Sequence, residues 1–109
     1  MARYPNMGGG NMQQLMRQAQ KMQQDMQQKQ EELNGREFTA QAGGGMVKAT
    51  VYGTRQLKGV EINPDCVDPD DVEMLQDLVV AAVNAAIAEA NETVERELGR
   101  LTGGMNLGF

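Results

Sequence analysis

The sequence has no histidine and no tryptophan, a single cysteine, and only two tyrosines and two phenylalanines among its 109 residues. Without histidine the chain lacks the most common general base and the most common ligand for transition metals. Cys66 has no histidine to activate it, which excludes a cysteine nucleophile of the usual kind. A single cysteine also excludes an internal disulfide and suits a reducing cytosol. We therefore expect a protein that is not an enzyme and has no cofactor.

The shortage of aromatic side chains also limits the core that one chain can build. Apolar residues make up 40% of the sequence, but most are Ala, Met, Val and Leu, which leaves few large side chains to fill an interior. Association of identical chains is a common remedy for so thin a core. The N-terminus has no apolar run, so we expect no signal peptide. The most apolar segment, residues 73–90, is interrupted by charged side chains and is not expected to cross a membrane.

Charge is divided unevenly along the chain. Residues 1–60 carry eight Lys and Arg against four Asp and Glu, a net +4, whereas residues 61–109 carry two against eleven, a net −9; the sum is the −5 of the whole chain. Such a division points to two surfaces with different electrostatic roles. The pI of about 4.6 is nevertheless far below the value typical of a DNA-binding domain. Composition alone therefore favours ordinary solvated charge.

A long amphipathic helix is predicted in the first third of the chain. Residues 1–10, which contain Pro5 and a glycine run, predict a flexible tail; Asn11 is the expected N-cap and Gly35 the expected C-terminal stop. Between them, apolar residues recur at the a and d positions of a heptad, which predicts a stripe that packs against the core or another helix. A Met-rich groove for varied ligands is the alternative. The a and d positions are Met12, Leu15, Ala19, Met22, Met26, Lys29 and Leu33.

Three short stretches with alternating apolar and polar residues follow, at residues 37–42, 45–53 and 57–62. Alternation of period two between glycine-containing turns predicts a three-stranded antiparallel meander. One face of this sheet is apolar and should be covered by a single helical layer. The residues expected on the apolar face are Phe38, Ala40, Ala42, Val47, Ala49 and Val51, and the third strand places Lys58, Val60 and Ile62 together.

A second long helix is predicted after the meander. Asp68 is the expected N-cap with Pro69 in the first turn, the helix should reach residues 100–101, and residues 103–109 should form a flexible C-terminal tail. The order helix, three strands, long helix (α-β-β-β-α) makes residues 11–102 one small α+β domain. A narrow sheet covers only one side of so apolar a helix, and a second copy in a symmetric dimer would cover the rest. The predicted dimer interface comprises Leu75, Leu78, Val79, Val83, Ala86 and Ile87.

Two patterns that could hold a ligand have simpler explanations. Asp65, Asp68, Asp70 and Asp71 could form a Mg²⁺ or Ca²⁺ site, but their spacing does not match the D-x-D-x-D-G loop, and acidic residues are common at a helix N-terminus. The three glycines at residues 43–45 could cradle a phosphate, but no Lys-Ser/Thr pair follows them, and a hairpin needs glycine in any case. We expect no metal site and no catalytic residue.

Binding through basic side chains is the remaining possibility. Arg17 and Lys21 are spaced i, i+4 and share one face of the first helix, and Arg55 is expected at a hairpin tip with its side chain reaching outward. Such side chains could neutralise phosphates while Gln and Asn contribute hydrogen bonds. The candidate DNA-binding residues are Arg17, Lys21, Lys29, Arg36, Lys48, Arg55 and Lys58.

Three sequence blocks, in the same order, resemble the YbaB/EbfC family of bacterial nucleoid-associated proteins. They are GMVKATVYG at residues 45–53, VEINP at 60–64 and EMLQDLVVAAVNAA at 73–86. The chain departs from the family pattern in its Gln- and Met-rich first helix and in its last residues, GGMNLGF. The resemblance implies a tweezer-like homodimer in the bacterial cytoplasm and nucleoid that binds double-stranded DNA with limited sequence preference, bends or compacts it, and influences gene expression. It supplies no particular set of DNA contacts, so the candidate residues rest on charge placement alone.

Other functions stay open at this point. The main alternative is a non-enzymatic protein-interaction module accessory to DNA recombination or replication, which would capture a protein through the Met-rich stripe. An enzyme would need an unusual active site built from carboxylates alone. The glycine- and methionine-rich ends could also recruit further copies into larger assemblies. Neither a membrane nor a small-molecule substrate is indicated as a partner.

Overall fold

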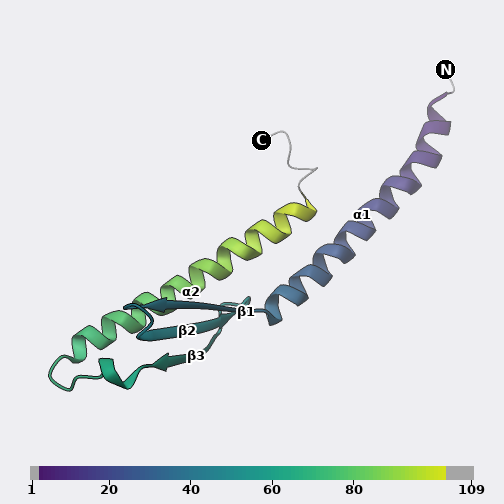
Figure 1. Ribbon diagram of the computed structural model, residues 1–109. Helices are drawn as coiled ribbons and strands as arrows, with labels where there is room; N and C mark the ends of the chain where they lie inside the picture. Colours follow the sequence, from purple (N-terminus) through teal and green to yellow (C-terminus); the bar gives the residue numbers. More distant parts are fainter. Residues whose placement is uncertain (1–2, 103–109) are drawn as a thin grey trace.

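The protein is an elongated molecule with dimensions of 84 × 26 × 16 Å. The computed structural model describes the backbone of residues 3–102 and the side chains of residues 11–102. The order of its elements confirms the predicted α-β-β-β-α fold of the α+β class (Figure 1). The elements are helix α1 (Arg3–Gly35), strands β1 (Glu37–Ala42), β2 (Val47–Tyr52) and β3 (Leu57–Ile62), the short 3-10 helix η1 (Pro64–Cys66), and helix α2 (Val72–Leu101).

The three strands form an antiparallel sheet in the order β1-β2-β3, as the alternation of the sequence predicts. Alternate residues make its inner face, where Phe38 lies opposite Val51 and Ala40 opposite Ala49. The turn between β1 and β2 contains three glycines at residues 43–45, all with positive φ (64°, 67° and 93°). Residues with a Cβ rarely adopt such angles, so the conformation of the turn explains why glycines occupy these three positions.

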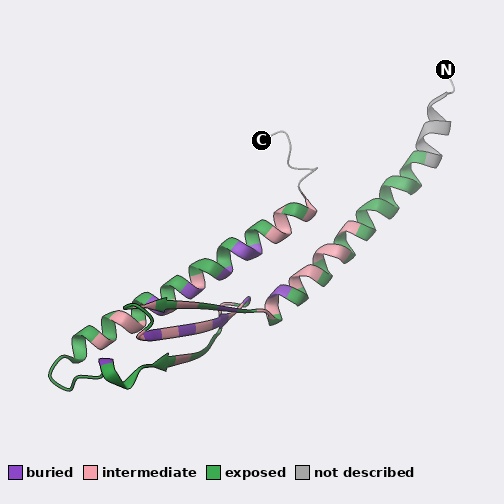
Figure 2. Cartoon of the chain, in the orientation of Figure 1, coloured by how far each residue is buried: buried purple, intermediate pink, exposed green. Residues whose placement is uncertain are grey.

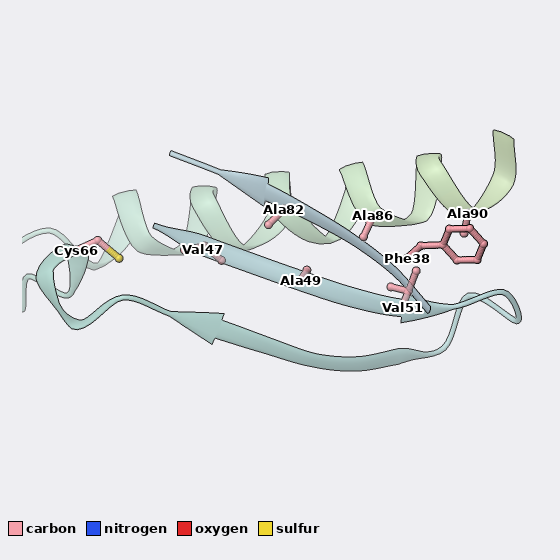
Figure 3. Packing of buried hydrophobic residues seen from close by; sticks show 8 residues of the cluster. All are labelled: Phe38, Val47, Ala49, Val51, Cys66, Ala82, Ala86 and Ala90. Atoms are coloured by element: carbon pink, nitrogen blue, oxygen red, sulfur yellow. The ribbon is translucent and has the colours of Figure 1, made fainter. Parts of the chain in front are cut away.

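Helix α2 lies across the inner face of β1 and β2 and supplies the other half of the core (Figure 3). Ala82, Ala86 and Ala90 are spaced four residues apart and are fully buried along one stripe of this helix. Their small side chains allow the helix backbone to approach the sheet closely, which confirms the predicted helical layer over the meander. The helix ends at Leu101, as predicted. The buried cluster consists of Phe38, Val47, Ala49, Val51, Cys66, Ala82, Ala86 and Ala90.

Strand β3 is left almost uncovered, because α2 packs over β1 and β2 and barely reaches the third strand (Figure 2). Leu57 and Ile62 on the inner side of β3 are 45% and 40% exposed, and Val60 between them is half-buried. Among the described residues, the core is therefore incomplete at this edge of the sheet.

A β-bulge changes the direction of one predicted side chain. Thr50 pairs with Gly59 but Val51 pairs with Leu57, so β3 contains one extra residue at Lys58. A bulge of this kind locally breaks the alternation of the strand. The prediction that Lys58 shares a face with Val60 and Ile62 is therefore wrong, and its ammonium lies on the outer face of the sheet instead.

Helix α1 begins at Arg3, so the prediction that Asn11 caps it is wrong. Pro5 falls in the first turn, where a missing N–H costs no intrahelical hydrogen bond. Glycine lowers helix propensity by about 1 kcal/mol per residue but does not prevent a helix from forming. The helix ends at Gly35, as predicted. The domain boundary at residue 10 stays a prediction, and residues 103–109, the predicted C-terminal tail, lie outside the described residues.

The end of α1 is fixed to the sheet by a buried side chain and a close backbone contact. Leu33 is fully buried, and the Gly53 N–H donates to the Arg36 carbonyl at 3.0 Å. A Cβ on Gly53 would overlap the carbonyl of Leu33, so only glycine fits at this position. From this junction α1 extends away from the sheet, and the side chains of residues 11–20 are all exposed (Figure 2). We call residues 11–26 the α1 arm.

Helix α2 begins later than predicted, at Val72. Its N-cap is Asp71, whose carboxylate accepts from the Met74 N–H at 3.2 Å. Asp68, the predicted cap, instead accepts from the Asp70 N–H at 2.9 Å in the preceding turn, so two carboxylates of the acidic cluster accept hydrogen bonds from backbone N–H groups. None of the helices in the described part of the chain has the length and apolar character needed to cross a membrane.

Candidate nucleic-acid interface

The α1 arm presents positive charge with few acidic residues nearby. Arg17 and Lys21 lie about one helical turn apart and are both exposed, and residues 11–24 contain no Asp or Glu. Neither side chain forms an ion pair with any residue that the structure describes. Asp25 follows Lys21 by four residues on α1 but forms no ion pair with it, so both cations are available to attract a polyanion.

Lys29, nearer to the sheet on α1, is engaged by two carboxylates. Its Nζ lies 2.9 Å from Glu97 on α2 and 3.1 Å from Glu32 on its own helix. The hydrogen bond to Glu97, followed by that to Glu32, raises the pKa of Lys29, and the same bond from Lys29 lowers the pKa of Glu97. The bridge to Glu97 ties α1 to α2. We therefore expect Lys29 to position the two helices and to add little net attraction for phosphate.

Arg36 and Lys58 are likewise paired with carboxylates. The Arg36 guanidinium lies 2.6 Å from Glu32, and the Lys58 ammonium lies 2.8 Å from Glu37; the hydrogen bond to Glu37 raises the pKa of Lys58. Exposed ion pairs contribute little to stability, so a phosphate could displace either carboxylate, but it would replace one attraction with another. Lys48 is half-buried on the outer face of the sheet and has no ion pair among the described residues.

Arg55 does not reach outward from the hairpin tip, so that prediction is wrong. Its backbone has a positive φ of 72°, and its side chain folds back against the molecule. Nε donates to the Asn91 side-chain oxygen on α2 at 2.6 Å, and Nη1 donates to the Gly53 carbonyl. These contacts hold the β2–β3 turn against α2. Arg55 and Asn91 are 36 residues apart, a separation at which local sequence pattern cannot reveal a contact.

Arg100 is a cation outside the set of DNA-binding residues predicted from the sequence. Arg100 lies in the last turn of α2, its side chain is 69% exposed, and its guanidinium is 3.6 Å from Glu97. A basic residue in the last turn of a helix is favoured by the helix dipole. The position of Arg100 near the predicted end of the helix was therefore the feature of the sequence that could have indicated it. The strongly acidic composition of residues 61–109 obscured it. Arg100 is a further candidate for phosphate contact.

The residues predicted to form the dimer interface fall into two groups. Ala86 is fully enclosed in the core of its own chain and offers no surface to a partner. The other five are partly buried against the same cluster, and their role in an interface stays a prediction. They are Leu75, Leu78, Val79, Val83 and Ile87.

Together these features define a small α+β protein with a basic helical arm, an acidic second helix and an open sheet edge. The chain belongs to the YbaB/EbfC DNA-binding family, whose model matches residues 7–105. The resemblance drawn from the three sequence blocks is thereby confirmed.

Individual relatives agree with this assignment. The chain is 51% identical over 104 residues to a nucleoid-associated protein of Clostridium acetobutylicum, a match that covers 95% of this chain and 93% of the relative. It is 54% identical over 105 residues to a nucleoid-associated protein of Clostridium novyi, covering 95% and 92%. The crystal structure of an uncharacterized Helicobacter pylori protein has a TM-score of 0.58 at 23% identity, covering 72% of this chain and 90% of that one. This last likeness concerns the fold alone.

Proposed function

We propose that this protein is a non-enzymatic, nucleoid-associated protein of the bacterial cytoplasm that binds double-stranded DNA with limited sequence preference. In this proposal it bends or compacts the duplex and thereby influences gene expression. Membership of a DNA-binding family and two nucleoid-associated relatives at 51% and 54% identity support it. The same findings do not favour the alternative of a protein-interaction module.

The observation that carries the proposal is the pair of exposed cations on the α1 arm. Arg17 and Lys21 are exposed cations on one helical face and have no carboxylate partner among the described residues. Contacts to phosphates supply affinity without carrying sequence information directly, which fits a protein with limited sequence preference. Helix α2 contains six Asp and Glu against two Arg, so we expect its acidic surface to face away from the duplex.

Fluorescence anisotropy with two unrelated labelled duplexes over a salt series tests this function. We expect similar affinities for both duplexes, because the arm offers charge rather than a base-reading pattern. Counterion release predicts that log K falls linearly with log salt, with a slope of about −0.9 for each phosphate neutralised. Absence of binding at low salt, or a strong preference for one duplex, would contradict the proposal.

We also infer that two copies associate through the open edge of the sheet. The exposed inner face of β3, formed by Leu57, Val60 and Ile62, needs an apolar cover that α2 of the same chain does not supply. Helical geometry places Val83 and Ile87 about 140° and 180° around α2 from Leu78, the side chain that lies beside the turn at the end of β1. Both residues therefore lie toward β3. We call the surface formed by Leu57, Val60 and Ile62 of β3, together with Val83 and Ile87 of α2, the β3 face.

Replacing Ile62 by aspartate is expected to convert the dimer into a monomer at micromolar concentration, because the dimer would have to bury an unpaired carboxylate on the β3 face. Light scattering or sedimentation measures the mass directly. Glu61→Gln is the matched control, because the neighbouring side chain points to the opposite face of the same strand. A monomeric parent protein, or an unchanged dimer in the Ile62 variant, would show that the β3 face is not the interface.

A further inference from the structure

The apolar stripe of the α1 arm has no cover within the described chain over most of its length. Leu15 is 60% exposed, and Met12 and Met16 are exposed to a similar extent. Farther along the helix the stripe packs against the rest of the chain, since Leu33, at the same heptad position as Met12, is fully buried at the junction with the sheet. The uncovered part thus begins where α1 passes beyond the end of α2 (Figure 1).

The uncovered stripe forms one side of an open apolar groove of about 780 Å³. Its α1 lining occupies the a, d, e and g positions of the heptad, which are the positions that surround the contact line in a pair of coiled helices. Thr102, the C-cap of α2, is the lining residue that does not belong to α1. The lining residues on α1 are Leu15, Gln18, Ala19, Met22, Gln23 and Met26.

We propose that the α1 arm pairs along this groove with the α1 arm of a second copy. A seam that repeats every seven residues fits another helix of the same period. The e and g positions that flank this seam are Met16, Gln18, Gln23 and Asp25, so the seam offers a single charge, at one end, to select a partner of opposite sign. A second copy presents the same amides of Gln18 and Gln23, which can hydrogen-bond to one another.

The charges of the arm agree with pairing between identical helices. Arg17 and Lys21 occupy the f and c positions of the heptad, on the side away from the a and d seam. Pairing would therefore keep the cations of the two arms apart and leave them exposed. Each paired arm could still contact DNA, so pairing would join two DNA-bound copies. This inference rests on the proposed function and gives a physical means of compacting DNA.

The seam and the β3 face lie at separate places on an elongated molecule (Figure 1). A chain with two self-association surfaces can form assemblies larger than a dimer. The seam spans only about two heptads, and helices of this length are marginal by themselves. We therefore expect weak pairing of free protein and stronger pairing when DNA raises the local concentration of arms.

Cysteine cross-linking tests the seam in the full chain, with Cys66→Ser removing the native thiol. Ala19 lies midway between Met12 and Met26, so two copies of residue 19 face each other in a parallel in-register pair and in a centred antiparallel pair alike. We expect the Ala19→Cys variant to form a disulfide-linked pair at least tenfold faster than the Arg17→Cys variant, whose thiol lies on the opposite side. Equal rates, or no linked pair from Ala19→Cys, would overturn the proposal.

A second variant separates this proposal from DNA binding itself. Leu15→Asp places a carboxylate in the seam at an exposed position, so the fold should persist, and thermal unfolding followed by circular dichroism checks this. Sedimentation should show loss of assemblies larger than a dimer, and a labelled duplex should no longer be retained on beads that carry a second duplex. Affinity for a single duplex should stay within about threefold of the parent. Unchanged assembly and bridging would overturn arm pairing, whereas a parent that binds no single duplex would contradict the proposed function instead.

Discussion

Replacing Gly53 by alanine is expected to lower the free energy of unfolding by about 3 kcal/mol, a value at the upper end for overpacking of a rigid site. The added Cβ would overlap the carbonyl carbon and oxygen of Leu33, which belong to backbone and cannot rotate away. Relief requires α1 to shift from the sheet, and this would weaken the hydrogen bond from the Gly53 N–H to the Arg36 carbonyl. It would also disturb the burial of Leu33.

Denaturant unfolding at one fixed protein concentration measures this effect, since the stability of an associating protein depends on concentration. Gly59→Ala is the matched control: it lies in β3, and nothing lies within 4 Å of the position of its Cβ. Alanine there should be neutral or slightly stabilising, because glycine weakens a strand interior. If the two variants unfold alike, the close contact between Gly53 and Leu33 does not fix the base of α1.

The order and type of the elements were predictable because each depends on local pattern. The alternation in residues 47–52 appears in the structure as strictly alternating buried and half-buried side chains, and the glycines at residues 43–45 mark the turn before it. The start of α2 was not predictable to the residue. Asp68 and Asp71 are both good N-caps, and the choice between them depends on a turn whose hydrogen bonds the sequence does not display.

The bulge in β3 shows a second limit of local pattern. The residues in LKGVEI allow a regular strand, and the extra residue at Lys58 becomes apparent only when β3 is paired with β2. A register shift changes which face each side chain occupies. For this reason the sequence could indicate that Lys58 belongs to a strand but could not indicate that it pairs with Glu37.

The sequence predicts which cations belong to the candidate site, but it does not show which of them are already paired with carboxylates and which are free to contact phosphate. The spacing of Lys29, Glu32 and Arg36 on one helix already predicts ion pairs between neighbours, and both pairs are present. The contact between Lys29 and Glu97 joins the two long helices and depends on the tertiary fold. Once paired and half-buried side chains are set aside, the exposed arm cations Arg17 and Lys21 become the main candidates.

Replacing Arg17 and Lys21 together by glutamine is therefore expected to weaken binding to every duplex by at least about tenfold at 0.1 M salt. The salt slope should become shallower by about 0.9 for each phosphate that the variant no longer neutralises. Both side chains are exposed and lack ion pairs among the described residues, so the fold should not change. Anisotropy titrations over a salt series measure both quantities, and the weakening should be similar for unrelated duplexes because phosphate contacts carry no base information.

The matched control is the double variant Arg36→Gln, Lys58→Gln, which changes the net charge of the chain by the same amount. Each of these cations already lies beside a carboxylate, Glu32 or Glu37, so its removal should cost a smaller part of the affinity. If both double variants lose affinity equally, binding depends on the total charge of the chain and not on the position of the arm. A larger loss in the arm variant would instead indicate that DNA lies along α1, where Arg17 and Lys21 are exposed and form no ion pair with the described residues.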